Sequence, residues 1–330
     1  MINIVQTMPN RLPDVQALFA SAYAARDTGD LAQAERTLRQ ILATGQEPLR
    51  ATTRLKAQTG LAQVWRQRGQ YRRAGLLLRL TLAAAEASCG PHSLQVAAAC
   101  NEWAILGKYT GDFDHAETLY QRALTIYEAV HGPEHHSVAT ICHNLGGLAH
   151  TRGNHVAGEP WARRAVEIRT HLLGEGDPMV AADAAAWASL LDGIGRHEEA
   201  ENVLRRALQV FENAYGLNHY EVAVTVHNLA ALAHRRGDLP AAQAGYGRAL
   251  AIKQLLLGSD HPECATTLTS LAANHYHQGQ HAQAVAYYAR AITILEPVVV
   301  SDHPVLAAAR RGLAQASTHA FSDREPSGSR

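Results

Sequence analysis

Apolar residues along this chain recur at the spacing of an amphipathic helix. In the segment AETLYQRALTIYEAVHG, residues 116–132, the positions Leu119, Ala123, Ile126 and Tyr127 share one helical face. Similar segments, each interrupted by glycine, follow one another from about residue 14 to residue 316. None of them shows the alternation of apolar and polar residues that is typical of a strand. The sequence therefore predicts an all-α fold.

The helical segments repeat with a regular period. HNLGGLAHTRGN, residues 143–154, and HNLAALAHRRGD, residues 227–238, are two periods apart. One glycine series has the same 42-residue spacing throughout and is preceded, at a slightly shorter distance, by Gly29; it consists of Gly69, Gly111, Gly153, Gly195, Gly237 and Gly279. Small residues stand seven positions before and five after each of these glycines, which lets two helices approach closely. Each unit is thus expected to be helix A, a tight turn at the glycine, helix B and a short joint.

A single helical hairpin cannot bury its apolar face, whereas stacked hairpins form a continuous core. The small residues, the RAL, RAV and RAI triplets and the joint from Gly258 to Pro262 resemble the tetratricopeptide repeat. The 42-residue period resembles the kinesin-light-chain type of that family. The resemblance implies a right-handed superhelical solenoid of about seven helix-turn-helix repeats with a C-terminal capping helix. We expect an N-terminal tail over residues 1–13, the solenoid over 14–316 and a disordered C-terminal tail over 317–330.

Composition narrows the function classes. Lys and Arg number 30 and Asp and Glu also number 30, so no global field favours nucleic acid or an anionic membrane. The first residues lack the pattern of a signal peptide, and no apolar run is long enough for a membrane span. Four cysteines without a CxxC pair are typical of a reduced, cytoplasmic protein. The unusual feature is the presence of 19 histidines.

Most of these histidines have a structural interpretation. The joint position is shared by His135, His219, His261 and His303, and there we expect the imidazole to cap or pack the joint. The position two residues after the turn glycine is shared by His155, His197 and His281; in other units it holds Tyr71 and Phe113. One flat ring replaces another at that position, so we expect these three histidines to be structural as well.

A second set of polar residues falls on helix A. The resemblance implies that helix A lines the inner, concave surface, and residues seven apart share one helical face. We expect the following side chains to line a binding groove: Asn101, Lys108, Tyr109, His143, Asn144, His150, Asp192, His227, Asn228, His234, Arg235, Tyr276, His277 and Arg311. Kinesin-light-chain-like repeats often hold the ligand backbone with an Asn nine residues before the turn glycine, and here only Asn144 and Asn228 match it.

The main hypothesis is an interaction scaffold without a cofactor, which binds a peptide or protein partner in this groove. The alternative is a metal-dependent or acid–base enzyme, because His150, Asp192 and His234 occupy one level of the groove. Two histidines and a carboxylate suit Zn or Fe. Two other interpretations remain open. The groove could be inert and merely tolerate polar residues, or its histidines could bind an acidic partner in a pH-dependent manner. No phosphate-binding loop, HExxH or GxSxG motif occurs. The partner and the oligomeric state stay open.

Overall fold

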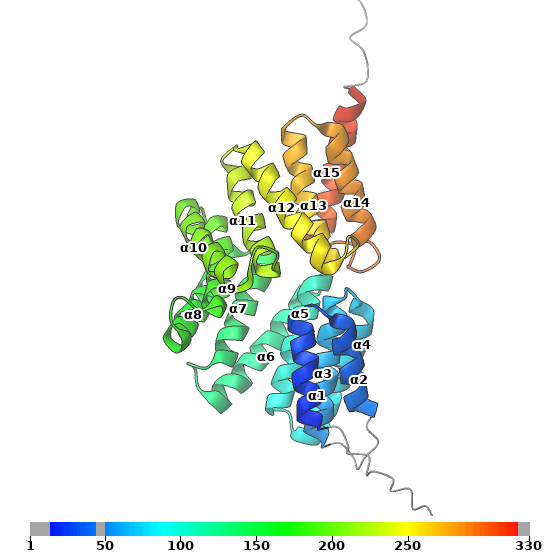
Figure 1. Ribbon diagram of the computed structural model, residues 1–330, viewed down its shortest axis with the longest axis vertical. Helices are drawn as coiled ribbons and strands as arrows, with labels where there is room; N and C mark the ends of the chain where they lie inside the picture. The colour runs from blue at the N-terminus through cyan, green and yellow to red at the C-terminus, as the bar shows by residue number, and fades with distance from the viewer. Residues whose placement is uncertain (1–13, 44–49, 323–330) are drawn as a thin grey trace, which may run out of the picture.

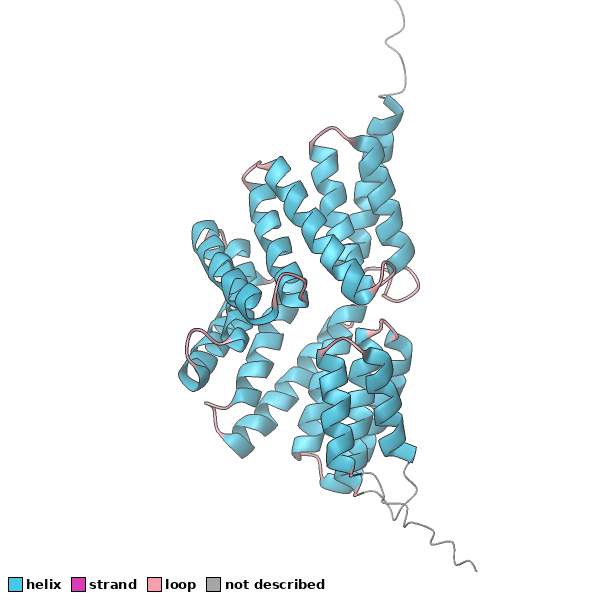
Figure 2. Cartoon of the chain, in the orientation of Figure 1, coloured by secondary structure: helices cyan, strands magenta, loops and turns pink. Residues whose placement is uncertain are grey.

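The computed structural model describes residues 14–43 and 50–322, and this part of the chain is built of helices and loops without strands (Figure 2). The helices are α1 (Val15–Asp27), α2 (Leu31–Ala43), α3 (Ala51–Gln67), α4 (Tyr71–Cys89), α5 (Leu94–Thr110), α6 (Phe113–His131), α7 (His136–Thr151), α8 (His155–Leu173), α9 (Pro178–Gly193), α10 (His197–Tyr215), α11 (Tyr220–Arg235), α12 (Leu239–Leu257), α13 (Pro262–His277), α14 (His281–Leu295) and α15 (Pro304–Ser322). Odd-numbered helices up to α13 are helix A of a unit, and the following even-numbered helix is helix B. The predicted solenoid of seven hairpins and a capping helix is confirmed.

The turn glycines end helix A as predicted. All seven have a positive φ, between 69° at Gly69 and 94° at Gly111, a region that side chains with a Cβ rarely adopt. At Gly111, for example, the amide donates to the carbonyl oxygen of Gly107, and the next amide donates to the same oxygen. The chain can therefore reverse within a few residues and start helix B.

Small residues allow helices A and B of one unit to touch. A Cβ added to Gly146 on α7 would lie 3.0 Å from the Cβ of Ala162 on α8 and 3.2 Å from its backbone nitrogen. The equivalent Ala62, Ala104 and Ala272 are fully buried. Because the helices approach this closely, leucines and aromatic residues beside the crossing are also excluded from water, and several successive units share one apolar cluster.

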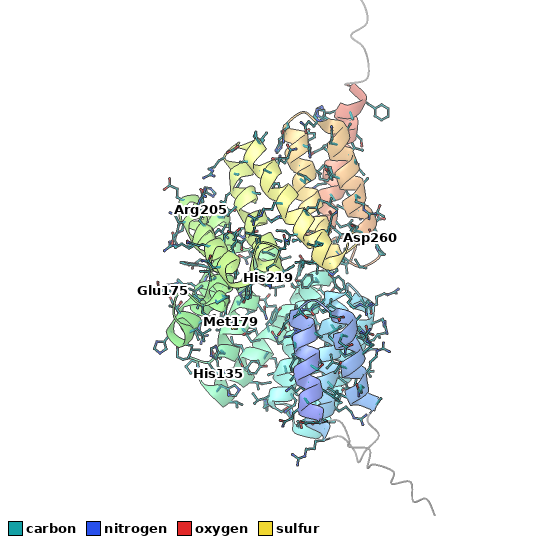
Figure 3. All side chains as sticks on the ribbon, viewed as in Figure 1. His135, Glu175, Met179, Arg205, His219 and Asp260 are labelled. Carbon is teal, nitrogen blue, oxygen red and sulfur yellow. The ribbon has the colours of Figure 1, made fainter. Side chains whose placement is uncertain are left out.

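The joint histidines cap the helices that follow them. The Nδ1 atoms of His135, His219 and His261 accept from the backbone N–H two residues later, at 3.1, 3.3 and 3.2 Å. His135 and His219 can be located in Figure 3 at the starts of α7 and α11. The predicted capping role is confirmed at these three joints, where the imidazole satisfies an otherwise unpaired helical N–H group.

The C-terminal helix is longer than predicted. Helix α15 continues past the expected boundary at residue 316 to Ser322. The ring of His319 lies 5.7 Å from that of Tyr276 and 5.1 Å from that of His281, so contacts with α13 and α14 stabilise the added turn. The prediction that the tail begins at residue 317 was wrong for 317–322. The remaining predicted tails, residues 1–13 and 323–330, lie outside the described residues.

The superhelix closes on itself. The joint before α13 reaches the turn between α3 and α4, where the His261 Nε2 atom is 2.6 Å from the carbonyl oxygen of Gln67. The joint before α15 reaches the next turn, where the amide of Val300 donates to the carbonyl oxygen of Thr110 at 3.1 Å. Figure 1 shows the corresponding approach of α12–α14 to α3–α5. We call these contacts the closure seam.

Candidate functional site

The predicted groove residues lie on the A helices and on α15. The set is distributed as follows: Asn101, Lys108 and Tyr109 on α5, His143, Asn144 and His150 on α7, Asp192 on α9, His227, Asn228, His234 and Arg235 on α11, Tyr276 and His277 on α13, and Arg311 on α15. Arg311 is exposed and is not joined to the others. The structure brings most of the remaining residues into contact with neighbouring A helices.

Several groove residues bond one unit to the next. The Asn144 side chain donates to the Oδ1 atom of Asn101 at 2.9 Å, and the Asn228 side chain donates to the Oγ atom of Ser189 at 3.1 Å. His227 Nδ1 is 3.2 Å from the Thr267 hydroxyl. These amides and this imidazole thus stabilise the stacking of units, a role that sequence reasoning did not give them.

His234 and His277 form a hydrogen-bonded chain that starts at Asn274. The Asn274 amide nitrogen donates to the carbonyl oxygen of Leu239 at 3.0 Å, so its Oδ1 atom is the acceptor for His234 Nδ1 at 2.8 Å. The His234 Nε2 atom then accepts from His277 Nδ1 at 3.0 Å. In this arrangement the Nε2 atom of the exposed His277 is a hydrogen-bond acceptor.

Carboxylates of the groove region are already paired. Asp192, which is 7% exposed, contacts His197 Nδ1 at 2.7 Å and the guanidinium of Arg235. On the neighbouring helices, His143 Nδ1 lies 2.8 Å from Asp183, whose other oxygen contacts Arg169 at 2.7 Å. Two buried negative charges are thereby balanced within the protein.

The metal hypothesis gains no support from this arrangement. His150, Asp192 and His234 are not brought together, because Asp192 bonds to His197 and Arg235 and His234 bonds to Asn274 and His277. Among residues 14–43 and 50–322, no group of three or more His, Cys, Asp or Glu side chains is arranged to hold a metal ion. The Zn or Fe site stays a hypothesis.

His150, one of the predicted groove residues, lines a surface hollow. A hollow of about 390 Å³ at the turn end of α7 is lined by His150, Thr151, Ser189 and Arg235, with Pro304 of α15 at its edge. The His150 ring remains accessible to solvent on one side. Desolvation by the groove walls, and then the charges of His155, Lys108 and Arg235, lower the pKa of His150 to about 4. The imidazole is therefore neutral at pH 7 and can donate or accept a hydrogen bond.

The histidines that follow the turn contact the predicted groove residues of the same unit. The ring of His155 lies 5.1 Å from that of His150, and the ring of His281 lies 5.2 Å from that of Tyr276. With the His197–Asp192 contact, they show one rule: the residue five positions after a groove residue packs on it across the turn. The structural role predicted for these histidines agrees with the contacts, but the sequence analysis did not predict that they contact the groove residues. Their constant distance of five positions from those residues in the sequence was the available signal.

The buried Glu263 links residues from distant units of the chain. The carboxylate of Glu263, at the start of α13, accepts hydrogen bonds from the hydroxyls of Tyr109 and Tyr220 and lies 3.5 Å from Lys253 Nζ. Burial alone would raise the pKa of Glu263, but Lys253 and the two hydroxyls hold it below its usual value. Sequence reasoning missed Glu263, because nothing local indicates that it meets Tyr109 across the superhelix.

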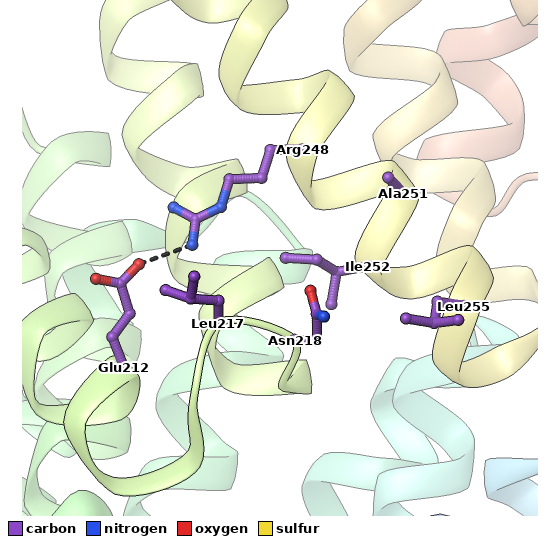
Figure 4. Close-up of a pocket in the computed structure, with 7 residues that line it drawn as sticks. All are labelled: Glu212, Leu217, Asn218, Arg248, Ala251, Ile252 and Leu255. Carbon is purple, nitrogen blue, oxygen red and sulfur yellow. Dashed lines mark hydrogen bonds and ion pairs between the residues drawn. The ribbon is translucent and has the colours of Figure 1, made fainter.

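Another hollow lies on the outer side, away from the predicted groove residues. It measures about 520 Å³ between α10 and α12 and is lined by Leu217, Ile252 and Leu255 (Figure 4). Across its edge, Arg248 donates to Glu212 at 2.7 Å. This charge pair is satisfied within the protein.

No helix within residues 14–43 and 50–322 has the length and apolar character needed to cross a membrane.

The sequence pattern that defines the tetratricopeptide repeat family matches residues 95–171, 143–213, 180–254 and 221–297. No curated protein matches the chain.

Solved structures with the same fold include three of low sequence identity that differ in coverage. The Rap protein complexed with competence and sporulation factor is 16% identical, with a TM-score of 0.66, 94% of this chain covered and 87% of that one. The kinesin light chain TPR-like repeats of Podosopora anserina are 21% identical, with a TM-score of 0.50 and coverages of 63% and 98%. The APC/C hetero-tetramer Cut9–Hcn1 is 16% identical, with a TM-score of 0.59, 89% of this chain covered and 48% of that one. At these identities the likeness concerns the fold alone.

Proposed function

This chain belongs to the tetratricopeptide repeat family, and we propose that it is an interaction scaffold that holds a peptide or protein partner in its concave helix A groove. The observation that carries the proposal is the hollow at His150, which the chain's own residues leave accessible. Its volume lies within the range of ligand sites. Thr151, Ser189 and Arg235 supply the polar groups that an extended partner backbone needs.

The paired carboxylates support a binding role. Asp192 is held by His197 and Arg235, so it fixes the guanidinium at the edge of the hollow. A fixed donor loses little conformational entropy when a partner binds. Two structures of this fold are named as complexes, the Rap protein with its factor and Cut9–Hcn1. The role proposed here is of the same kind, and no partner is carried over from them.

The proposal can be tested by photocrosslinking in cells. A photoreactive amino acid in place of His150 is expected to form covalent adducts with the partner. The same amino acid in place of Arg206, which is exposed on α10, is the control and is expected to form none. Equal adduct formation at the two positions would show that the groove is not the working surface.

Affinity then gives a second readout with the partner identified by these adducts. Arg235→Gln is expected to weaken binding by about tenfold, the loss of one charge-assisted hydrogen bond. Arg236→Gln is the matched control, because Arg236 is adjacent in sequence but pairs with Glu201 on the outer side. Equal affinities of the two variants would contradict the proposed groove contact.

A further inference from the structure

A regular set of ion pairs covers the side of the solenoid where helix B meets the next turn. In several units a Glu six residues after the turn glycine pairs with an Arg directly before the next turn glycine. In some units the Glu at this position pairs with an Arg one helical turn further along its own helix. The first kind comprises Arg68–Glu35, Arg152–Glu117 and Arg236–Glu201, and the second comprises Arg39–Glu35, Arg163–Glu159 and Arg205–Glu201.

Helix α4 breaks this pattern. Gly75 stands where the Glu belongs, and Thr110 stands where the Arg before the next turn belongs. Arg79 occupies the position of Arg39 and Arg205, but its helix offers no carboxylate one turn earlier. Within the described part of the chain, neither Arg79 nor Arg72 is in an ion pair. The first acidic residue of α4 is Glu86, near its end, so the outer face of the helix is positively charged.

The missing side chains leave a hollow of about 480 Å³ between α4 and α5. Its floor is apolar and includes Leu76, Trp103, Leu106 and Val298, while Arg72 and Arg79 also line it. Leu76 is 58% exposed. One turn further, Leu80 is 64% exposed at a position where the following units have Arg.

We propose that this α4–α5 hollow is a second docking surface, which takes a protein segment that carries a large apolar side chain flanked by carboxylates. The apolar side chain fills the hollow against Leu76 and Trp103, and the carboxylates pair with Arg72 and Arg79. Two adjacent features thus fit one ligand: an apolar floor and two arginines without internal partners. A buried apolar anchor with charged neighbours is the usual form of an energetic hot spot.

The chemistry of the hollow favours a protein over a polyanion. Nucleic acid would use the two guanidinium groups and leave the exposed Leu76 and the partly exposed Trp103 in contact with water. The outer hollow of Figure 4 differs in this respect, because its Arg248 is already paired with Glu212 and its charge is balanced within the protein. At α4 the positive charge is available to a partner. The lining of this hollow shares no residue with that of the hollow at His150, so the two surfaces are distinct.

The experiment is a selection from a displayed library of random peptides against the full chain. Peptides that the Arg72→Glu/Arg79→Glu variant also binds are subtracted. We expect the remaining peptides to carry Leu, Phe or Trp beside Asp or Glu. A synthetic peptide with the selected sequence should bind the double charge variant at least about tenfold more weakly than the unaltered chain.

Two further variants separate docking from folding. Gly75→Glu/Thr110→Arg rebuilds the missing ion pair and covers the hollow, so it should cause a similar loss of peptide binding with unchanged helicity. Arg206→Glu is the control, since Arg206 is exposed and bonds to the carbonyl oxygen of Asn202 on its own helix. It should bind the peptide as the unaltered chain does.

Several results would overturn the proposal. One is a selection in which no peptide distinguishes the chain from the Arg72→Glu/Arg79→Glu variant, and another is a set of distinguishing peptides without carboxylates. A short DNA duplex or anionic vesicles that bind in an Arg72- and Arg79-dependent manner, in place of peptides, would assign the surface to another class of partner. A dimer that dissociates in the double charge variant would assign it to a second copy of this chain.

Discussion

The imidazole of His261 joins two parts of the chain that are 194 residues apart. Its Nδ1 atom accepts from the Glu263 amide at 3.2 Å, so the ring proton is on Nε2. This Nε2–H group donates to the carbonyl oxygen of Gln67 at 2.6 Å. One side chain therefore caps α13 and fastens the closure seam, and the neutral tautomer of the ring serves both purposes.

The seam contribution of His261 can be measured against His219. Both residues cap a helix through Nδ1, but only His261 reaches a distant carbonyl. Asn retains a capping side chain. We expect His261→Asn to lower the free energy of unfolding by about 1 kcal/mol more than His219→Asn, the net value of the lost hydrogen bond. Denaturant unfolding checks this, and small-angle scattering should show a larger radius of gyration for His261→Asn alone. Equal effects would mean that the seam adds no stability.

Gly111 should tolerate a side chain less well than Gly153. Both have positive φ, so alanine costs about 1–2 kcal/mol at either position. At Gly153 nothing lies within 4 Å of the added Cβ, whereas at Gly111 it would lie 2.6 Å from the Cγ2 atom of Val300 in the closure seam. We expect Gly111→Ala to cost about 1–3 kcal/mol more. Thermal and denaturant unfolding of the pair measure the difference, and identical midpoints would argue against the seam.

The adjacent Gly146 and Gly147 of α7 should respond differently to leucine. A Cβ at Gly146 meets both the side chain and the backbone of Ala162, which cannot move apart without separating α7 from α8. A Cβ at Gly147 meets only the Nζ atom of Lys108 at 3.1 Å, at the end of a flexible side chain. We expect Gly146→Leu to destabilise by about 1–3 kcal/mol and Gly147→Leu to have little effect. The denaturant midpoints of the two variants measure the difference in stability. A larger loss of stability for Gly147→Leu would mean that Gly147, and not Gly146, lies at the contact with α8.

Stability should fall in acid because buried histidines resist protonation. Burial, and then the charge of Lys253, lower the pKa of His227 to about 3. In the unfolded chain the pKa of histidine is about 6.5, so the unfolded state binds more protons between these values. The contribution is complete above pH 6.5 and is lost progressively as pH decreases toward 3.

We therefore expect the melting temperature to decrease from pH 7 to pH 4.5. His227→Asn should weaken this pH dependence, whereas His171→Asn, at an exposed position of α8, should leave it unchanged. Differential scanning calorimetry across this pH range makes the comparison. An identical pH profile for His227→Asn and the unaltered chain would show that His227 does not titrate as its burial requires.

The sequence alone determined the unit and its repetition. The regular period, the glycines with positive φ and the small residues at the crossing depend on contacts within one hairpin or between neighbours, so each leaves a local signal. The caps at His135 and His219 were predictable for the same reason. The prediction of groove residues used the rule that residues seven apart share a helical face.

Only the tertiary structure decided how distant units of the stack meet. The contact of Glu263 with Tyr109, the bond of His261 to Gln67 and the return of Val300 to Gly111 depend on how small rotations between units add up along the stack. No local sequence pattern predicts the total rotation, because each joint contributes only a small part of it. The same limit applied to Asp192: the sequence placed it on helix A, but its pairing with Arg235 on α11 became visible only once α9 and α11 were placed side by side.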